Sequence, residues 1–174
     1  MASVPKRDRK ATAMVSTERS SQAIAVYVRL LAEAGIHGID LSDFDDRMFL
    51  SKFCYVAGSI GLGCGDRFMW GLRGPYSPDL MEEFLGADWE TARAHAASVL
   101  IDGSAFPKLL WLGSLVRERP TGSTRGTWLE AVATLAYLLD HGADTERLLA
   151  EGGSSEAYYV PAMGYLLGVG KVPG

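Results

Sequence analysis

Apolar residues recur at the spacing of one helix face through most of the chain. A recurrence every three or four positions is typical of a helix that is buried on one side. It predicts helices over residues 21–35, 42–60, 78–85, 89–100, 107–118 and 127–139, with two shorter helices over 144–151 and 155–167. The helix over 127–139 is apolar around most of its circumference, so we expect it to be central.

A different pattern, with a period of two, appears between residues 66 and 73. Phe68, Trp70 and Leu72 alternate with less apolar or smaller positions, which predicts a half-buried strand with Trp70 in the core. The fold class is therefore mainly α (α+β): a compact helical domain of six to eight helices with a short β-hairpin or wing around residues 60–73.

The strand leads into a turn and then a helix. Gly74 and Pro75 are expected to end the strand, because this pair breaks regular structure. Ser77, Pro78 and Asp79 fit the cap and the first two positions of a helix: a hydroxyl acceptor, a residue without an N–H, and an acid near the positive helix end. Gly74, Pro75, Ser77 and Pro78 thus predict a rigid corner between the strand and the helix.

The two ends of the chain differ in composition. Residues 1–18 hold four basic residues within five positions and few large apolar ones, which predicts a disordered basic tail. Such a tail either keeps the protein in solution or contacts phosphate or an acidic partner. Residues 19–174 are expected to form a single helical domain, with a linker-like loop at 119–126 that is rich in Gly, Pro, Ser and Thr.

Composition narrows the class of protein. The 174 residues include 48% hydrophobic and 22% charged residues, and the net charge of −4 does not favour nucleic acid binding by the molecule as a whole. Cys54 and Cys64 are too few for a disulfide framework and are expected to be reduced thiols. No leader and no apolar run of about 18–20 residues is seen, so we expect a cytoplasmic protein without a membrane segment.

The sequence holds no catalytic, cofactor-binding or metal-binding pattern. The glycines at 61–65 follow a helix and precede a strand, the reverse of the order in a dinucleotide-binding loop, and are better explained by a helix end and a turn. His37, His95 and His141 fall in three separate elements. The expectation is a protein that is not an enzyme and has no cofactor, while a hydrolase or nuclease remains a third alternative that requires residues to converge on folding.

Several residues around the corner are candidates for binding. Lys52, Arg67 and Arg73 are expected either to form a small basic patch beside a helix N-terminus, a natural anion site, or to lie on a solvated face with local salt bridges. Tyr76 is expected either to pack inside the turn or, if exposed, to anchor a partner.

The layout of these residues resembles a known family. Lys52 and Tyr55 in a helix, Trp70 in a strand, the run Gly74-Pro75-Tyr76-Ser77-Pro78 and then Leu80 resemble the YwgA-like family of uncharacterised prokaryotic proteins. They are more distantly similar to the Panacea (SocA-like) antitoxin domain. The resemblance covers roughly residues 45–140 and includes the apolar helix over 127–139.

The resemblance implies a small helical domain without a cofactor that binds a toxin or other effector protein, or nucleic acid, in mobile or defence-related settings. The leading hypothesis is therefore a non-catalytic binding module, antitoxin-like or regulatory, that docks a partner protein. The alternative is a winged-helix-like DNA-binding regulator. The residues expected to contact the partner are Lys52, Tyr55, Arg67, Trp70, Arg73 and Tyr76.

Overall fold

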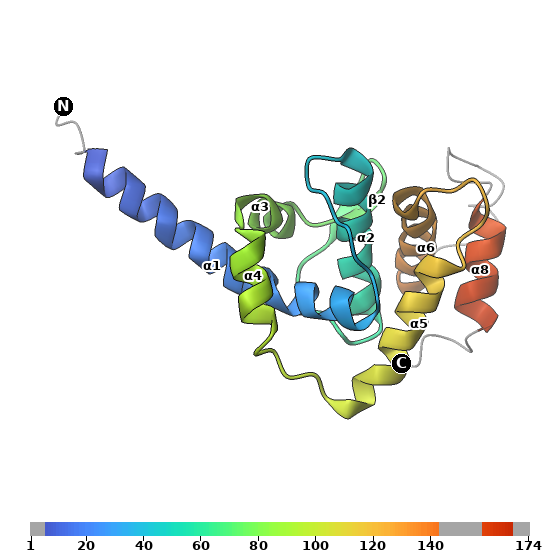
Figure 1. The fold of residues 1–174 in the computed structure, drawn as a ribbon. Helices are drawn as coiled ribbons and strands as arrows, with labels where there is room; N and C mark the ends of the chain where they lie inside the picture. Colours follow the sequence, from blue (N-terminus) through green and yellow to red (C-terminus); the bar gives the residue numbers. More distant parts are fainter. Residues whose placement is uncertain (1–5, 143–157, 169–174) are drawn as a thin grey trace.

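The computed structural model describes residues 6–142 and 158–168. Within them the elements are α1 (Lys6–Glu33), α2 (Phe44–Ser59), β1 (Met69–Gly71), β2 (Gly74–Tyr76), α3 (Pro78–Gly86), α4 (Trp89–Ala96), the 3-10 turn η1 (Gly103–Ala105), α5 (Phe106–Arg117), α6 (Arg125–Asp140) and α8 (Tyr159–Gly168) (Figure 1). This confirms the mainly helical fold with a short two-stranded sheet. The helix expected over 144–151 lies outside the described residues. No described helix is long and apolar enough to cross a membrane.

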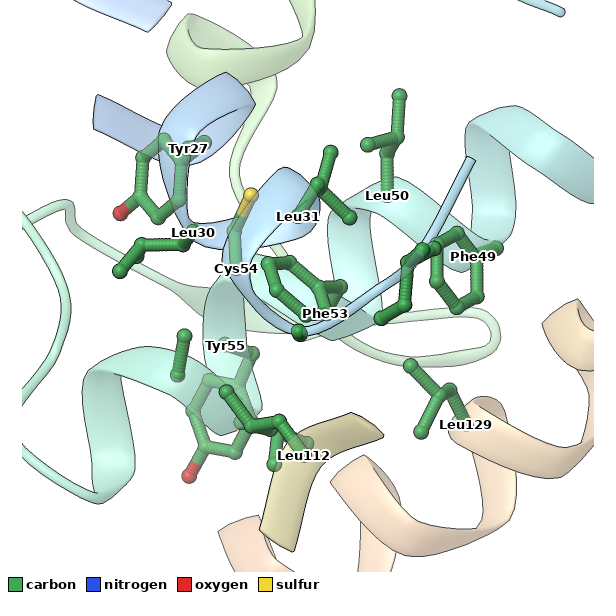
Figure 2. Packing of buried hydrophobic residues seen from close by; sticks show 14 of the residues in the cluster. Tyr27, Leu30, Leu31, Phe49, Leu50, Phe53, Cys54, Tyr55, Leu112 and Leu129 are labelled. Carbon is green, nitrogen blue, oxygen red and sulfur yellow. The ribbon is translucent and has the colours of Figure 1, made fainter. Parts of the chain in front are cut away.

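The core is built around α2, which packs along α6 and is buried on most sides. The stripe Phe49, Phe53, Val56 and Ile60 is buried, as its spacing predicts. Figure 2 shows Phe49 and Phe53 of this stripe between leucines of α1 on one side and Leu112 of α5 and Leu129 of α6 on the other. Trp128 of α6 is also buried, and its indole N–H donates to the carbonyl of Leu115 in α5 at 2.7 Å.

The first helix is longer than the sequence pattern indicated. α1 begins at Lys6, so residues 6–18, predicted as a disordered basic tail, continue the helix instead. The physical reason is that no glycine or proline occurs between Lys6 and Glu33, and the added residues are mostly good helix formers. The second half of α1 packs against α3 and α4, while its first half extends away from the rest of the molecule (Figure 1).

The hairpin lies later in the chain than predicted. β1 and β2 pair antiparallel with Met69 opposite Tyr76, Trp70 opposite Pro75 and Gly71 opposite Gly74. Gly74 and Pro75 therefore belong to the second strand, and do not end the first. Hydrogen-bonded and non-hydrogen-bonded residue pairs alternate along an antiparallel sheet. Gly71 and Gly74, beside the two-residue turn, form a hydrogen-bonded pair, so Trp70 and Pro75 form a non-hydrogen-bonded pair in which the missing N–H of Pro75 is not needed.

The burial expected for three residues is wrong. Trp70 is 51% exposed and Leu72 is fully exposed. Leu85 of α3, which the helical pattern of Met81, Phe84 and Leu85 predicts to face the core, is 59% exposed. β1 spans only three residues, and Leu72 lies in the turn that follows it, where strand alternation no longer applies. Phe68, in the loop before β1, is only partly buried.

Local signals placed the helix starts well. The Ser77 hydroxyl accepts from the N–H of Leu80, Pro78 occupies the first turn of α3, and Asp88 caps α4, all as predicted. Ser42 and Asp43 both fit the start of α2 by residue type, and Asp43 is the one that caps it. Pro161 falls in the first turn of α8, where it needs no kink.

The second strand of the hairpin is held between α2 and α6. Gly74 has a φ of +79°, and a Cβ added there would lie 2.3 Å from Oγ1 of Thr134 in α6. On the other side, Nζ of Lys52 in α2 donates to the carbonyl of Pro75 at 2.7 Å. The hairpin is thus fixed to both helices by a close backbone approach and one buried hydrogen bond.

Replacing Gly74 by alanine tests this approach. We expect Gly74→Ala to lower the free energy of unfolding by roughly 2–4 kcal/mol, because left-handed strain and a steric clash combine. Gly38→Ala is the matched control: its φ is +67° but nothing lies within 4 Å of the added Cβ, so it should cost only about 1–2 kcal/mol.

Urea unfolding followed by circular dichroism measures both variants. When Thr134→Ala is already present, the further substitution Gly74→Ala should lower the free energy of unfolding by an amount closer to that of Gly38→Ala. The reason is that the Thr134 hydroxyl no longer obstructs the added Cβ. Equal costs for Gly74→Ala and Gly38→Ala in the otherwise unchanged protein would contradict the close approach.

Candidate functional site

A surface groove lies where α2, the hairpin turn and α3 meet, and we call it the hairpin groove. Its volume is about 460 Å³, within the range of ligand-binding clefts. It is lined by Phe44, Arg47, Met48, Ser51, Lys52, Leu72, Arg73, Gly74, Tyr76, Met81 and Leu85. These residues come from three elements that are separated in the sequence and are brought together by the position of the hairpin.

Large apolar side chains surround the hairpin groove. Phe44 is 56% exposed and Leu85 59% exposed, and Leu72 at the tip of the turn is fully exposed. Single exposed apolar residues are ordinary, but several around one concave surface are typical of an interaction site. Phe44, Leu72 and Leu85 do not belong to the buried core cluster of the described residues.

Two arginines flank the ring of Phe44. The guanidinium carbon of Arg73 lies 5.4 Å from the ring centroid and that of Arg47 lies 5.8 Å from it, both within cation–π range. Arg47 is also held by the carbonyls of Leu41 and Ser42, each at 2.8 Å. Arg73 is held less tightly: its side chain is half exposed, and its ion pair with Glu130 spans 3.5 Å.

The floor of the hairpin groove holds two buried polar groups. Lys52 is 3% exposed, and its one hydrogen bond is to Pro75. Burial lowers the pKa of Lys52 to about 8; Glu130 partly opposes this shift, and Arg73 adds to it. Beside it, the hydroxyl of buried Ser51 has no hydrogen-bond partner among the described residues.

The structure divides the residues that the sequence singled out for binding. Lys52, Arg73 and Tyr76 line the hairpin groove, and Tyr76 is 40% exposed, as an anchoring residue would be. Trp70 lies on the opposite face of the hairpin, because its neighbour Met69 is the residue that pairs with Tyr76. Arg67 is exposed in the loop before β1 and is not part of the groove.

Tyr55 and Trp70 attach the hairpin to α6 and do not form a site with Lys52. The ring of Trp70 lies 5.2 Å from that of Tyr137, and Tyr55 contacts Phe68 edge-on at 5.2 Å. The Tyr55 hydroxyl donates to Asp140 at 3.1 Å. These aromatic contacts support the face of the hairpin that points away from the groove.

Sequence reasoning missed several groove residues although a signal was present. Phe44, Arg47, Met48 and Ser51 occupy positions 44, 47, 48 and 51, the spacing of a single helix face. This second face of α2 lies beside the core stripe that was recognised. Leu85 was missed for a different reason, because it was assigned to the core.

Arg125, at the end of the loop that precedes α6, makes contacts inside the protein. Arg125 pairs with Asp46 and donates to the carbonyls of His37 and Gly38. The N-terminus of α6 is also occupied, since the carboxylate of Asp45 accepts from the N–H of Gly126 at 3.2 Å. An anion site at this helix end would have to displace a carboxylate that the fold already supplies.

The remaining candidates do not converge. His37 lies in the loop between α1 and α2, His95 lies in α4, and His141 caps the end of α6. Across residues 6–142 and 158–168, no group of three or more His, Cys, Asp or Glu side chains is placed to hold a metal ion. The glycine run ends α2 as expected, with positive φ at Gly61 and Gly65, and the two cysteines are free thiols.

Comparison of the chain with protein-family models, with curated proteins and with solved structures gives no match. The resemblance to the YwgA-like family therefore stays a prediction.

The buried amine of Lys52 should make stability depend on pH in a defined window. The folded state holds this pKa near 8, below the usual 10.5. Between these values the unfolded chain binds a proton that the folded protein does not, so the stability contributed by this site rises with pH and levels off above the window.

Burial also raises the pKa of Cys54, Cys64 and Tyr27, and these shifts lower the stability of the folded protein as pH rises through the alkaline range. Because the three groups are present in both proteins, a comparison of wild type with Lys52→Met isolates the contribution of Lys52. The difference in unfolding free energy between wild type and variant, measured in urea from pH 7 to 10.5, should shift in favour of wild type as pH rises. A constant difference would show that Lys52 is not held at a low pKa.

Proposed function

We propose that this chain is a non-catalytic binding module that docks a partner protein in the hairpin groove. The observation that carries the proposal is the set of exposed apolar side chains around one concave surface, Phe44, Leu72 and Leu85, rimmed by two arginines. Interface centres combine large apolar or aromatic anchors with arginine in this way.

The charges at the groove favour a partner segment that is both apolar and acidic. Arg47, Lys52 and Arg73 bring three positive charges to the groove, and no Asp or Glu is among the described residues that line it. Glu130 beside Arg73 and Asp40 near Arg47 offset only part of this charge. The molecule as a whole carries a net charge of −4, so the local excess of positive charge is a property of this surface. Complementary charge would orient an acidic partner and suppress others.

The family resemblance fits the same proposal. YwgA-like and Panacea proteins suggest a toxin or other effector as the partner, and the strand and corner that carry the resemblance form one wall of the groove. DNA binding is less well supported, because α2, the helix before the hairpin, is buried at most of its positions and offers little surface to a DNA groove.

Photocrosslinking from the groove tests the proposal. Benzoylphenylalanine placed at Leu72 should capture one discrete protein in cells of the source organism. The matched control is the same residue at Leu100, which is also almost fully exposed but lies in the loop after α4. We expect no discrete product from position 100.

A second substitution ties the product to the groove. Adding Leu85→Glu to the Leu72 probe should abolish the crosslink, since it places a charge on the opposite wall, while an exposed leucine elsewhere, Leu110→Glu, should leave it unchanged. Equal products from positions 72 and 100, or a product insensitive to Leu85→Glu, would argue against docking at this surface.

A further inference from the structure

We propose that the floor of the hairpin groove is an anion subsite that receives the C-terminal carboxylate of a partner chain ending in a large apolar residue. The inference rests on the proposed function and adds the chemistry of the segment that is bound. It is carried by three residues that line the groove and bear hydrogen-bond donors: Ser51, Lys52 and Arg73.

The buried hydroxyl of Ser51 is the first observation that favours a ligand at the floor of the groove. Its residue is 4% exposed, its hydroxyl is shielded from water, and it has no partner in the described structure. A buried hydroxyl without a hydrogen bond is unfavourable, and such groups are uncommon in folded proteins. A carboxylate oxygen in the groove would satisfy this hydroxyl after a rotation of the Ser51 side chain toward the groove that the residue lines.

The two cations have donor capacity left. The ammonium of Lys52 has three donors, of which the structure uses one, to Pro75 at 2.7 Å. Arg73 has five, and its contacts to Glu130 at 3.5 Å and to the Met48 sulfur at 3.8 Å are both long. Glu130 neutralises only one of these two charges, so the pair retains an excess positive charge for an incoming anion.

The position of the apolar surface favours a chain terminus over an internal acidic residue. The guanidinium of Arg73 lies 5.4 Å from the ring of Phe44, so the charged and apolar parts of the groove adjoin. A C-terminal residue carries its side chain and its carboxylate on the same Cα and can occupy both parts at once. An internal Asp or Glu supplies the carboxylate but needs a second residue for the apolar contact.

A pair of small probes separates the charge from the apolar contact. N-acetyl-L-phenylalanine ends in a carboxylate and mimics a C-terminal residue, and N-acetyl-L-phenylalaninamide is its neutral isostere. Each is titrated into the ¹⁵N-labelled full chain at pH 7, and the amide resonances of residues 44–52 and 72–76 report binding.

We expect the acid to bind about tenfold more tightly than the amide, as a charge-assisted contact would produce. Arg73→Gln should abolish this ratio and Arg73→Lys should restore part of it, while Ser51→Ala should reduce it severalfold. Arg93→Gln removes an exposed arginine of α4 that pairs with Glu90 and should leave the ratio unchanged. Thermal unfolding of every variant verifies that it is folded.

The outcomes separate the inference from the proposed function. Equal binding of acid and amide at the groove overturns the anion subsite while leaving apolar docking intact. Resonance shifts confined to other surfaces, or no binding of either probe, also overturn it, and the crosslink from Leu72 then decides the proposed function independently. A peptide ending in Leu-Phe whose affinity is unchanged by C-terminal amidation would likewise overturn the choice of a chain terminus.

Discussion

The insertion of one short strand between two helices governs the arrangement of this molecule. β2 lies against α6 through Gly74, where no side chain fits, and against α2 through the hydrogen bond from Lys52 to Pro75. The strand has only three residues and cannot be stable alone. Its position between α2 and α6 therefore depends on tertiary contacts, and the groove, the exposed turn and the start of α3 all follow from it.

Lys52 belongs both to the attachment of the hairpin and to the lining of the hairpin groove. A buried ammonium is costly to desolvate, and a hydrophobic residue of similar size is often as stable or more so. Here the cost is offset in part by the Pro75 carbonyl and by the nearby charge of Glu130. Lys52 also lines the groove, so the residue that positions the hairpin is one that we propose as a ligand for an anion. This dual role gives a physical reason for keeping a charge where a methionine would pack.

The two faces of the hairpin have different surroundings. On one face Trp70 rests on Tyr137, which also contacts Tyr55 and His141, so this face is supported by an aromatic row on α2 and α6. On the other face Tyr76 and the turn residues border the groove. Because successive strand residues point to opposite faces, three residues are enough to give the hairpin one face attached to α6 and another that borders the groove.

The sequence by itself determined α2 to α6, most of their caps, the order strand, corner and helix, and the core stripe of α2, because each depends on residues a few positions apart. It placed the second strand wrongly, since Gly74-Pro75 has the local character of a strand end and only pairing with Gly71 and Trp70 makes it a strand. Tertiary structure alone decided that Lys52 is buried and that Phe44, Arg73 and Leu85 share one groove. These are contacts between distant segments, and local patterns carry no information about which distant segment will cover a given side chain.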